Sequence, residues 1–176
     1  MRRSGKERDA WSLLLEAPTD KDVVISPDDW WVERRANIYN ALYAGERKVA
    51  YQLAANHGEL TVNPLKDAEF MAGWIALRFL RDAKTAARHF HALGKAADGP
   101  ISRAEADYWL GRTYEVLADR SLANEHYARA GSDPTTFYGQ LALQTLDKKI
   151  STLAIEAAPS PDAAAAAAFT GRDIVK

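Results

Sequence analysis

This sequence predicts an all-α protein, an α-solenoid or superhelix of antiparallel helical hairpins. Helical signals dominate the chain, and its one β-branched run, at residues 23–25, is short enough to be a connector. The expected helices are joined by loops of only a few residues, and short loops make neighbouring helices antiparallel. Several hairpins of about 30 to 40 residues in a row are typical of a solenoid, in which each hairpin buries its apolar face on the next.

Each expected helix has its own start or stop signal. The first helix is expected at residues 6–16, with Trp11 on its apolar face and Pro18 beyond its end. The second is expected at residues 27–44, because Ser26 suits the capping position and Pro27 the first turn. The other helices are expected at residues 46–56, 63–81, 82–93, 101–118, 120–130 and 133–148, with Asp82 and Asp133-Pro134 opening two of them and Gly94 and Gly131 closing two.

Two of the hairpins follow the spacing of tetratricopeptide repeats, a pattern of Leu-Gly, aromatic, Ala, aromatic and Ala. Its small residues let the two helices approach, and its aromatic residues fill the space around that contact. The third hairpin matches with Leu110-Gly111, Tyr114, Ala123, Tyr127 and Ala130; the second has Ile75-Ala76, Phe79, Ala86, Phe90 and Leu93; the first offers only Tyr43, Ala50 and Ala54.

The chain divides by composition into two parts. Residues 1–150 form the predicted α-superhelical repeat domain, and residues 151–176 form an Ala/Pro-rich tail or the start of a truncated further repeat. For the tail, one interpretation is a flexible linker. The other is a new helix, capped by Ser160 with Pro161 in its first turn, and the sequence favours neither.

Composition excludes several classes of function. The chain has 176 residues with a net charge of −1, a balance that gives no electrostatic footprint for nucleic acid. No segment approaches the roughly 18 apolar residues of a membrane-spanning helix, so no membrane insertion is expected. The first six residues, Met1 to Lys6, lead into a charged stretch and not into a secretory signal, so the chain as written is expected to be cytoplasmic.

No catalytic, cofactor-binding or metal-ligating motif stands out. The chain lacks cysteine, and it has neither a glycine-rich phosphate loop nor a nucleophile elbow. His89 and His91 are two positions apart on a helix, so they point to different faces and cannot jointly hold a metal. We expect these two, His57 and His126 to be solvated or capping histidines. Carboxylates such as Glu69 and Asp107 are likewise expected on solvated polar faces.

Aromatic residues are the remaining signal, with five Trp and seven Tyr. Trp74 and Trp109 lie 35 positions apart on the first helices of consecutive hairpins. Core packing is one role for them; the other is a row of aromatic platforms on a concave face, suited to sugars or peptides. Arg78 and Arg112 follow them within a helical turn. The candidate groove or inter-repeat contacts are therefore Trp74, Arg78, Trp109, Arg112 and Tyr138.

Four segments together resemble the helical region of soluble lytic murein transglycosylases. They are residues 29–35 (Asp-Trp-Trp-Val-Glu-Arg-Arg), 73–78 (Gly-Trp-Ile-Ala-Leu-Arg), 108–112 (Tyr-Trp-Leu-Gly-Arg) and 137–142 (Phe-Tyr-Gly-Gln-Leu-Ala). The resemblance implies a long superhelix joined to a lysozyme-like domain. That domain cleaves peptidoglycan between N-acetylmuramic acid and N-acetylglucosamine, leaving a 1,6-anhydro product. The motifs that would carry its catalytic Glu are not found here, so no catalytic residue is assigned.

Two functions follow from these observations. The first is the superhelical scaffold domain of a lytic transglycosylase, periplasmic if it belongs to an exported enzyme, with the glycan strand or the missing catalytic domain as partner. The alternative is a free-standing tetratricopeptide-like adaptor for a protein or peptide. No catalytic activity is expected of this chain alone. An exposed apolar end of the stack would also allow weak self-association.

Overall fold

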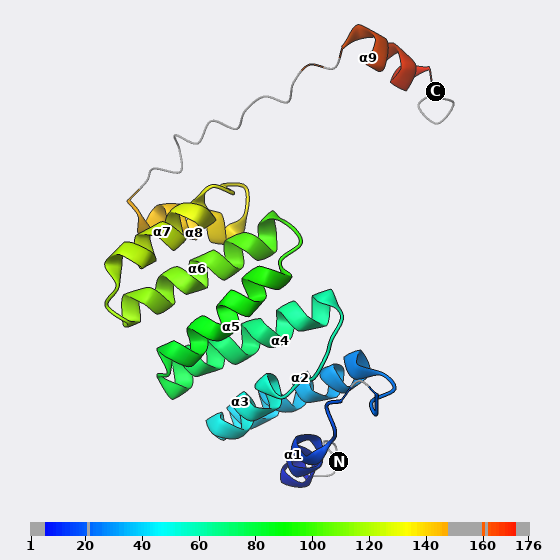
Figure 1. The fold of residues 1–176 in the computed structure, drawn as a ribbon, viewed down its shortest axis with the longest axis vertical. Coiled ribbons are helices and arrows are strands. Elements are labelled where there is room, and N and C mark those ends of the chain that lie inside the picture. Colours follow the sequence, from blue (N-terminus) through cyan, green and yellow to red (C-terminus); the bar gives the residue numbers. More distant parts are fainter. Residues whose placement is uncertain (1–5, 21, 148–159, 161, 172–176) are drawn as a thin grey trace.

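The computed structural model describes residues 6–20, 22–147, 160 and 162–171, and in these ranges all regular secondary structure is helical (Figure 1). The predicted all-α class is confirmed. None of the described helices combines the length and apolar character that a membrane span requires. The elements are α1 (Glu7–Glu16), α2 (Pro27–Tyr43), α3 (Arg47–Ala55), α4 (Val62–Ile75), the π-helical turn η2 (Ala76–Leu80), α5 (Ala83–Ala96), α6 (Pro100–Val116), α7 (Arg120–Gly131), α8 (Phe137–Thr145) and α9 (Ala163–Thr170).

From α1 to α8, helices that follow one another in sequence also pack on one another. The pairs α2–α3, α4–α5 and α6–α7 are antiparallel hairpins, here called the first, second and third hairpin (Figure 1). Successive hairpins are in contact through α3 with α4 and through α5 with α6, and α8 packs on both helices of the third hairpin. Helix α1 packs on both helices of the first hairpin.

All three hairpins are built around the same turn. One residue between the helices adopts the left-handed backbone conformation, with φ of 80°, 57° and 60° at Gly45, Arg81 and Ala118. The residue after it is the N-cap of the second helix. In the second and third hairpins that cap is an aspartate, and Asp82 and Asp119 each accept a backbone N–H bond of 3.0 Å from three residues on. These carboxylates satisfy a donor that the helix start would leave unpaired.

The packing positions after the turn are also shared. Four positions after each cap lies a buried alanine, and eight positions after it lies a second buried residue, so one face of each second helix meets its partner. In the three hairpins these pairs are Ala50 and Ala54, Ala86 and Phe90, and Ala123 and Tyr127.

Each aromatic ring at the last of these positions covers a glycine of the first helix. A Cβ added at Gly111 would lie 2.6 Å from the Tyr127 ring, and one added at Gly73 would lie 2.7 Å from Phe90. The repeat pattern aligned Ala76 of the second hairpin with Gly111 of the third. The residue under the Phe90 ring is instead Gly73, about one helical turn earlier. Because η2 is wound with i→i+5 bonds, it takes up one extra residue, so Gly73 precedes Phe90 by one position more than Gly111 precedes Tyr127.

Several predicted helix ends differ from those in the structure. Ser26 makes no side-chain cap bond at the start of α2. Helix α5 continues through Gly94 to Ala96, since a helix interior tolerates glycine at a modest cost. Helix α8 begins at Phe137, after the expected Asp133-Pro134, because the Thr136 hydroxyl accepts the Gly139 N–H at 3.0 Å.

The tail contains a helix, α9. Asp162, and not Ser160, caps it by accepting the Ala165 N–H at 2.7 Å. None of its residues is buried. The predicted domain boundary at residue 150 lies outside the described residues, as does Pro161.

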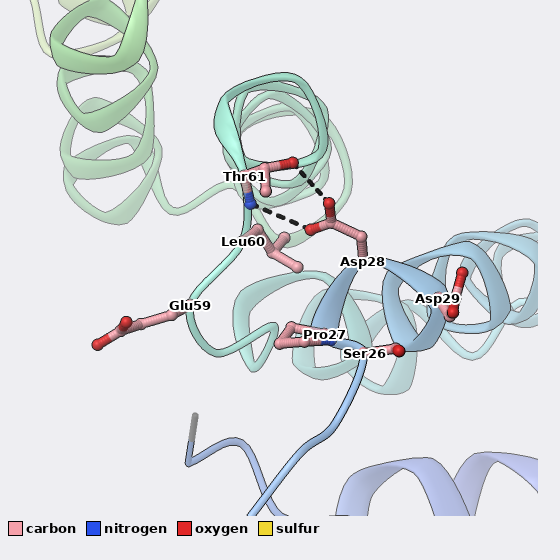
Figure 2. Close-up of a pocket in the computed structure, with 7 residues that line it drawn as sticks. All are labelled: Ser26, Pro27, Asp28, Asp29, Glu59, Leu60 and Thr61. Carbon is pink, nitrogen blue, oxygen red and sulfur yellow. Dashed lines mark hydrogen bonds between the residues drawn. The ribbon is translucent and has the colours of Figure 1, made fainter. Parts of the chain in front are cut away.

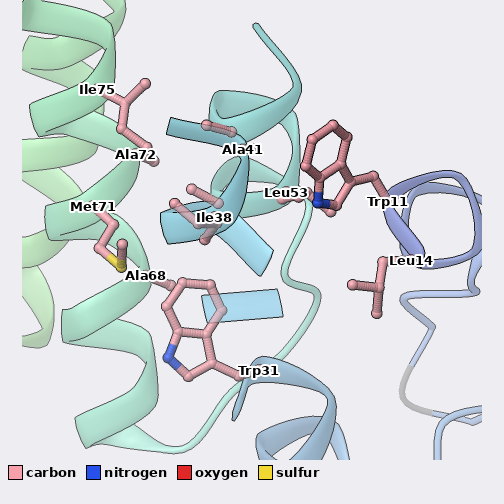
Figure 3. Close-up of a cluster of buried hydrophobic side chains, with 12 residues drawn as sticks. Trp11, Leu14, Trp31, Ile38, Ala41, Leu53, Ala68, Met71, Ala72 and Ile75 are labelled. Atoms are coloured by element: carbon pink, nitrogen blue, oxygen red, sulfur yellow. The ribbon is translucent and has the colours of Figure 1, made fainter. Parts of the chain in front are cut away.

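The core is a series of three buried clusters, one after another along the hairpins. In the first cluster, Trp31 and Ile38 of α2 point toward Ala68 and Met71 of α4, while Trp11 of α1 covers the other side (Figure 3). Two tryptophans join the clusters: Trp74 packs against the first and second, and Trp109 against the second and third.

Candidate functional site

The two predicted tryptophans pack between hairpins. The Trp74 ring meets Phe79 edge to face at 5.1 Å between ring centres. Trp109 stacks on Phe90 of the second hairpin at 5.8 Å and meets Phe70 edge to face at 5.9 Å. Both side chains are half-buried. These contacts favour core packing over a row of open aromatic platforms.

Three of the five candidate residues gather around Tyr108. The Trp109 and Tyr138 rings lie 5.8 and 5.4 Å from its ring, and Arg112 Nη1 donates to its hydroxyl at 3.3 Å. That hydrogen bond raises the pKa of Arg112, and burial raises the pKa of Tyr138. Trp74 and the exposed Arg78 lie in the second hairpin, so the structure does not bring the five together as one site.

An open groove lies on the first helices of the first and second hairpins, α2 and α4. It is nearer the N-terminus than the five candidate residues predicted from the sequence. It has a volume of about 530 Å³ and runs between α2 and the start of α4. Aromatic, charged and amide side chains line it together, a mixture of apolar and polar groups that is also found in ligand pockets. The lining residues are Trp31, Val32, Arg35, Ala36, Tyr39, Asn63, Pro64 and Asp67. We call this surface the α2–α4 groove.

Asp67 organises the polar side of the α2–α4 groove. Its Oδ2 accepts a hydrogen bond from Trp31 Nε1 at 3.0 Å and pairs with Arg35 Nε at 2.9 Å. The Arg35 guanidinium in turn lies 6.0 Å from the centre of the Tyr39 ring. Tyr39 itself is 53% exposed. The groove therefore presents an exposed tyrosine ring beside the Arg35–Asp67 ion pair.

Further polar side chains lie beyond this groove, on α6 and α8. Glu105 of α6 is half-buried, and Tyr138 of α8 hydrogen-bonds to it. Burial raises the pKa of Glu105, the Tyr138 hydrogen bond lowers it, and the negative charge of Asp67 raises it again, with a net upward shift. Glu105 and Tyr138 thus connect α6 and α8, while the negative charge of Asp67 on α4 opposes the ionisation of Glu105.

A second hollow, at the start of α2, is a structural joint. The carboxylate of Asp28 accepts the backbone N–H of Thr61 at 3.0 Å and its hydroxyl at 2.5 Å (Figure 2). These two bonds tie the N-terminal turn of α2 to the residue that precedes α4. The Glu59 side chain points away from them (Figure 2). Since both Asp28 oxygens are used in this joint, it fixes the spacing of the helices that form the α2–α4 groove.

The sequence did not predict a polar network in which Glu69 lies between two histidines. Glu69 Oε1 lies 3.3 Å from His57 Nε2, and its Oε2 lies 2.7 Å from His89 Nδ1. The other nitrogen of His89 bonds to the Tyr51 hydroxyl at 3.1 Å. The predicted solvated positions of His89 and Glu69 are wrong, because their side chains are only 16% and 13% exposed. His57 was expected at the carbonyls that end the preceding helix; its Nδ1 instead lies 2.6 Å from the carbonyl oxygen of Gly58. The four residues come from α3, α4, α5 and one loop, and no local spacing relates them.

His126 also differs from the prediction. It is buried, with 4% exposure, and its Nδ1 lies 2.7 Å from Asp107 Oδ1. His89 and His91 do point to different faces, since His91 contacts Tyr114 and His126 instead of Glu69. In the described part of the chain, no three His, Asp or Glu side chains form a group that could hold a metal ion.

The chain was compared with known proteins at the level of family, sequence and structure. No protein-family model matches it, and neither do curated proteins or solved structures at a significant level. The assignment of function therefore depends on the residues and geometry described above.

Proposed function

We propose that this chain is an α-solenoid of tetratricopeptide-like hairpins that works as a scaffold and binding arm, without catalytic chemistry of its own. The supporting observation is the turn shared by the three hairpins, with a left-handed residue, an N-cap and buried residues four and eight positions later. Because the hairpins share the same construction, they present similar surfaces to their neighbours, and each can bury its apolar side on the next hairpin.

We further propose that the arm belongs to a peptidoglycan lytic transglycosylase and grips the glycan strand in the α2–α4 groove. The four sequence segments that resemble that family support this assignment. The groove supports the ligand class: the Tyr39 ring offers a face for a sugar ring, while Arg35 and Asp67 offer hydrogen bonds to hydroxyl and amide groups. The arm would be periplasmic if it is exported with such an enzyme.

The second candidate is an adaptor that holds a protein segment in the same groove. The observation that favours it is the exposed Val32 on the groove wall, 61% exposed beside Tyr39, because aliphatic positions suit peptide side chains better than sugars.

Titration calorimetry of the purified chain with uncrosslinked glycan strands, and separately with stem peptides, distinguishes the two candidates. We expect glycan binding, weakened about fivefold to tenfold by Tyr39→Ala, since one aromatic contact contributes ~1 kcal/mol. Tyr43→Ala is the control, because Tyr43 is on the same helix, 97% exposed and outside the groove.

Binding of peptide alone would favour the adaptor. Absence of binding heat with either ligand at millimolar concentration would contradict a ligand-binding role. An equal loss of affinity in the Tyr39 and Tyr43 variants would show that the α2–α4 groove is not the binding site. We also expect no release of anhydro-muropeptides from purified peptidoglycan; their appearance would contradict the non-catalytic assignment.

A further inference from the structure

A second groove, away from the α2–α4 groove, lies among α5, α6 and α7. It has a volume of about 430 Å³, and its lining contains three basic side chains and one carboxylate. We call it the α5–α7 groove. The polar and aromatic residues that form it are His91, Lys95, Arg103, Tyr114, His126 and Arg129, together with the carboxylate of Asp107.

The carboxylates near this groove are already engaged by one of its cations. Arg129 Nε pairs with Asp107 at 3.0 Å, and its Nη1 pairs with Glu125 at 2.6 Å. Lys95 and Arg103, both exposed, have no ion pair with a carboxylate of the described residues. The lining therefore offers two available cations, from α5 and α6, and its own acidic groups do not neutralise them.

Three rings form one wall of the α5–α7 groove. Tyr114 stacks on His126 at 5.2 Å with an interplanar angle of 14°, and His91 lies 5.9 Å from His126. The His126 ring is held by Asp107, and His91 Nε2 bonds to the Tyr114 hydroxyl at 3.2 Å. Hydrogen bonds thus fix two rings in place before any ligand enters, which lowers the entropic cost of binding.

The floor between these groups is apolar: Ala106 and Leu110 are buried, with 2% and 3% exposure, and Leu122 is half-buried. Ala106, Leu110 and Leu122 line it, and Gly94 adds no side chain at the point where α5 meets α6. An apolar floor, a ring wall and two free cations suit one chemical class: a flat or apolar body that carries an oxyanion.

We propose that the α5–α7 groove binds a small organic oxyanion, with the carboxylate or phosphate on Lys95 and Arg103 and the ring or apolar body against His91, Tyr114 and Leu122. This site is independent of the glycan-gripping role proposed for the α2–α4 groove, because the two grooves share no lining residue.

The groups that face His91 give the site a direction of pH dependence. Burial lowers the pKa of His91, and the nearby His126 and Arg129 of α7 and Lys95 of α5 lower it further, while Asp107 of α6 raises it. An anion placed among these groups stabilises the imidazolium form. Binding is therefore expected to take up a proton on His91 and to tighten as the pH falls toward the ordinary histidine range.

The test is an NMR titration of the histidine ring signals of the full chain with four probes. Phenyl phosphate and benzoate carry the oxyanion on a ring, benzamide is the neutral analogue, and inorganic phosphate is the bare oxyanion. We expect both ring-bearing anions to shift the His91 and His126 signals at millimolar concentration. Benzamide is expected to bind at least about tenfold more weakly, since one charge-assisted hydrogen bond is worth ~1.5 kcal/mol or more. Inorganic phosphate keeps the charge but lacks the ring, so it is expected to bind about fivefold more weakly, since one aromatic contact contributes ~1 kcal/mol. The tighter of the two anions identifies the carboxylate or phosphate source.

Matched variants keep the result specific. The double variant Lys95→Gln, Arg103→Gln is expected to weaken phenyl phosphate about tenfold or more, as two charge-assisted contacts are lost. Lys84→Gln, an exposed change in the first turn of α5 outside the groove, is expected to change affinity less than about twofold.

Three results would overturn the proposal. They are equal binding of benzamide and benzoate, an equal loss with Lys84→Gln, and histidine signals that stay fixed with every probe. Binding of inorganic phosphate as tight as that of phenyl phosphate would remove the ring-bearing ligand class. Because the readout is at His91 and His126, failure here leaves the Tyr39 test of glycan binding untouched.

Discussion

At the scale of single residues, Glu69 shows how burial and hydrogen bonding compete. Burial by itself would raise the pKa of this carboxyl group, because the charged form loses water. The hydrogen bonds and charges from His57 and His89 outweigh burial and lower the pKa to about 2. The network therefore holds an ionised carboxylate at the contact of α4 with α5 and with the loop before α4.

A pH dependence of stability follows from this shift. The pKa of Glu69 is lower in the folded chain than its ordinary value of 4.5, so the unfolded state binds the proton more tightly. The stabilisation is complete above about pH 4.5 and is lost as the pH falls toward 2. We expect a loss of about 2 kcal/mol over this window, measured by urea unfolding, and a smaller loss in Glu69→Gln. Equal acid sensitivity in both proteins would contradict the assignment.

Arg34 is the other unusual residue of the core. It is only 2% exposed, and its Nη1 has no hydrogen-bond partner. Burial lowers the pKa of this guanidinium. Among the described carboxylates none forms an ion pair with it, whereas the neighbouring Arg35 pairs with Asp67. A buried charge without a counter-charge costs free energy that its packing must offset.

We therefore expect Arg34→Met to leave the fold intact and to raise the free energy of unfolding by about 1 to 2 kcal/mol, because an apolar side chain of similar length removes the unpaired charge. Arg35→Met is the comparison, and it should lower stability slightly through the loss of an exposed ion pair. Chemical denaturation of the two variants measures the difference. Strong destabilisation by Arg34→Met would show that its guanidinium has a favourable partner.

At the scale of elements, glycine determines how closely the helices of a hairpin approach. Gly111 and Gly73 lie under aromatic rings, where an added Cβ would come within 2.6 and 2.7 Å of ring carbons. Gly94 differs, because its added Cβ would lie 3.6 Å from Ala106, an ordinary contact. The same residue type thus has a packing role on α4 and α6 and none on α5.

The same substitution at two glycines is therefore expected to have opposite effects. Gly111→Ala should lower the free energy of unfolding by about 1 to 3 kcal/mol, since the rigid Tyr127 ring must move. Gly94→Ala should raise it by about 0.5 to 1 kcal/mol, because alanine is the better helix former. Thermal unfolding followed by circular dichroism measures both. Stabilisation by Gly111→Ala would mean that the helices do not approach as closely as described.

At the scale of the whole molecule, the three core clusters are joined by two half-buried tryptophans. Trp109 belongs to α6 but stacks on Phe90 of α5 and meets Phe70 of α4, so it couples the second and third hairpins. In a chain of this design each hairpin depends on its neighbour, and stability is approximately a sum of hairpin and interface contributions.

Removing that coupling should therefore change the cooperativity of unfolding as well as its free energy. We expect Trp109→Ala to destabilise the chain by about 3 kcal/mol and to make the third hairpin exchange its amide hydrogens earlier than the first. Trp30→Ala is the control, since this side chain is on the surface of α2. Uniform acceleration of exchange in all hairpins would contradict the modular description.

The sequence by itself determined the all-α class, the order of the helices and most of their ends. Caps such as Asp82, turn residues and apolar periodicity act over a few neighbouring residues, so they can be recognised locally. The predicted spacing also found Tyr127 and Phe90, the rings that pack inside the hairpins. It missed the extra residue in η2, because a π-helical turn has no distinctive local signal.

Only the tertiary structure decided which side chains meet. It placed Trp74 and Trp109 between the core clusters, and it brought Asp67 beside Arg35 and Glu69 between two histidines. It also formed the α5–α7 groove from three helices. Each of these contacts joins residues that are distant in sequence, and their distances depend on how the hairpins stack. The physical reason is that local hydrogen bonding specifies a helix, whereas burial, charge pairing and cavities arise only when separate helices pack together.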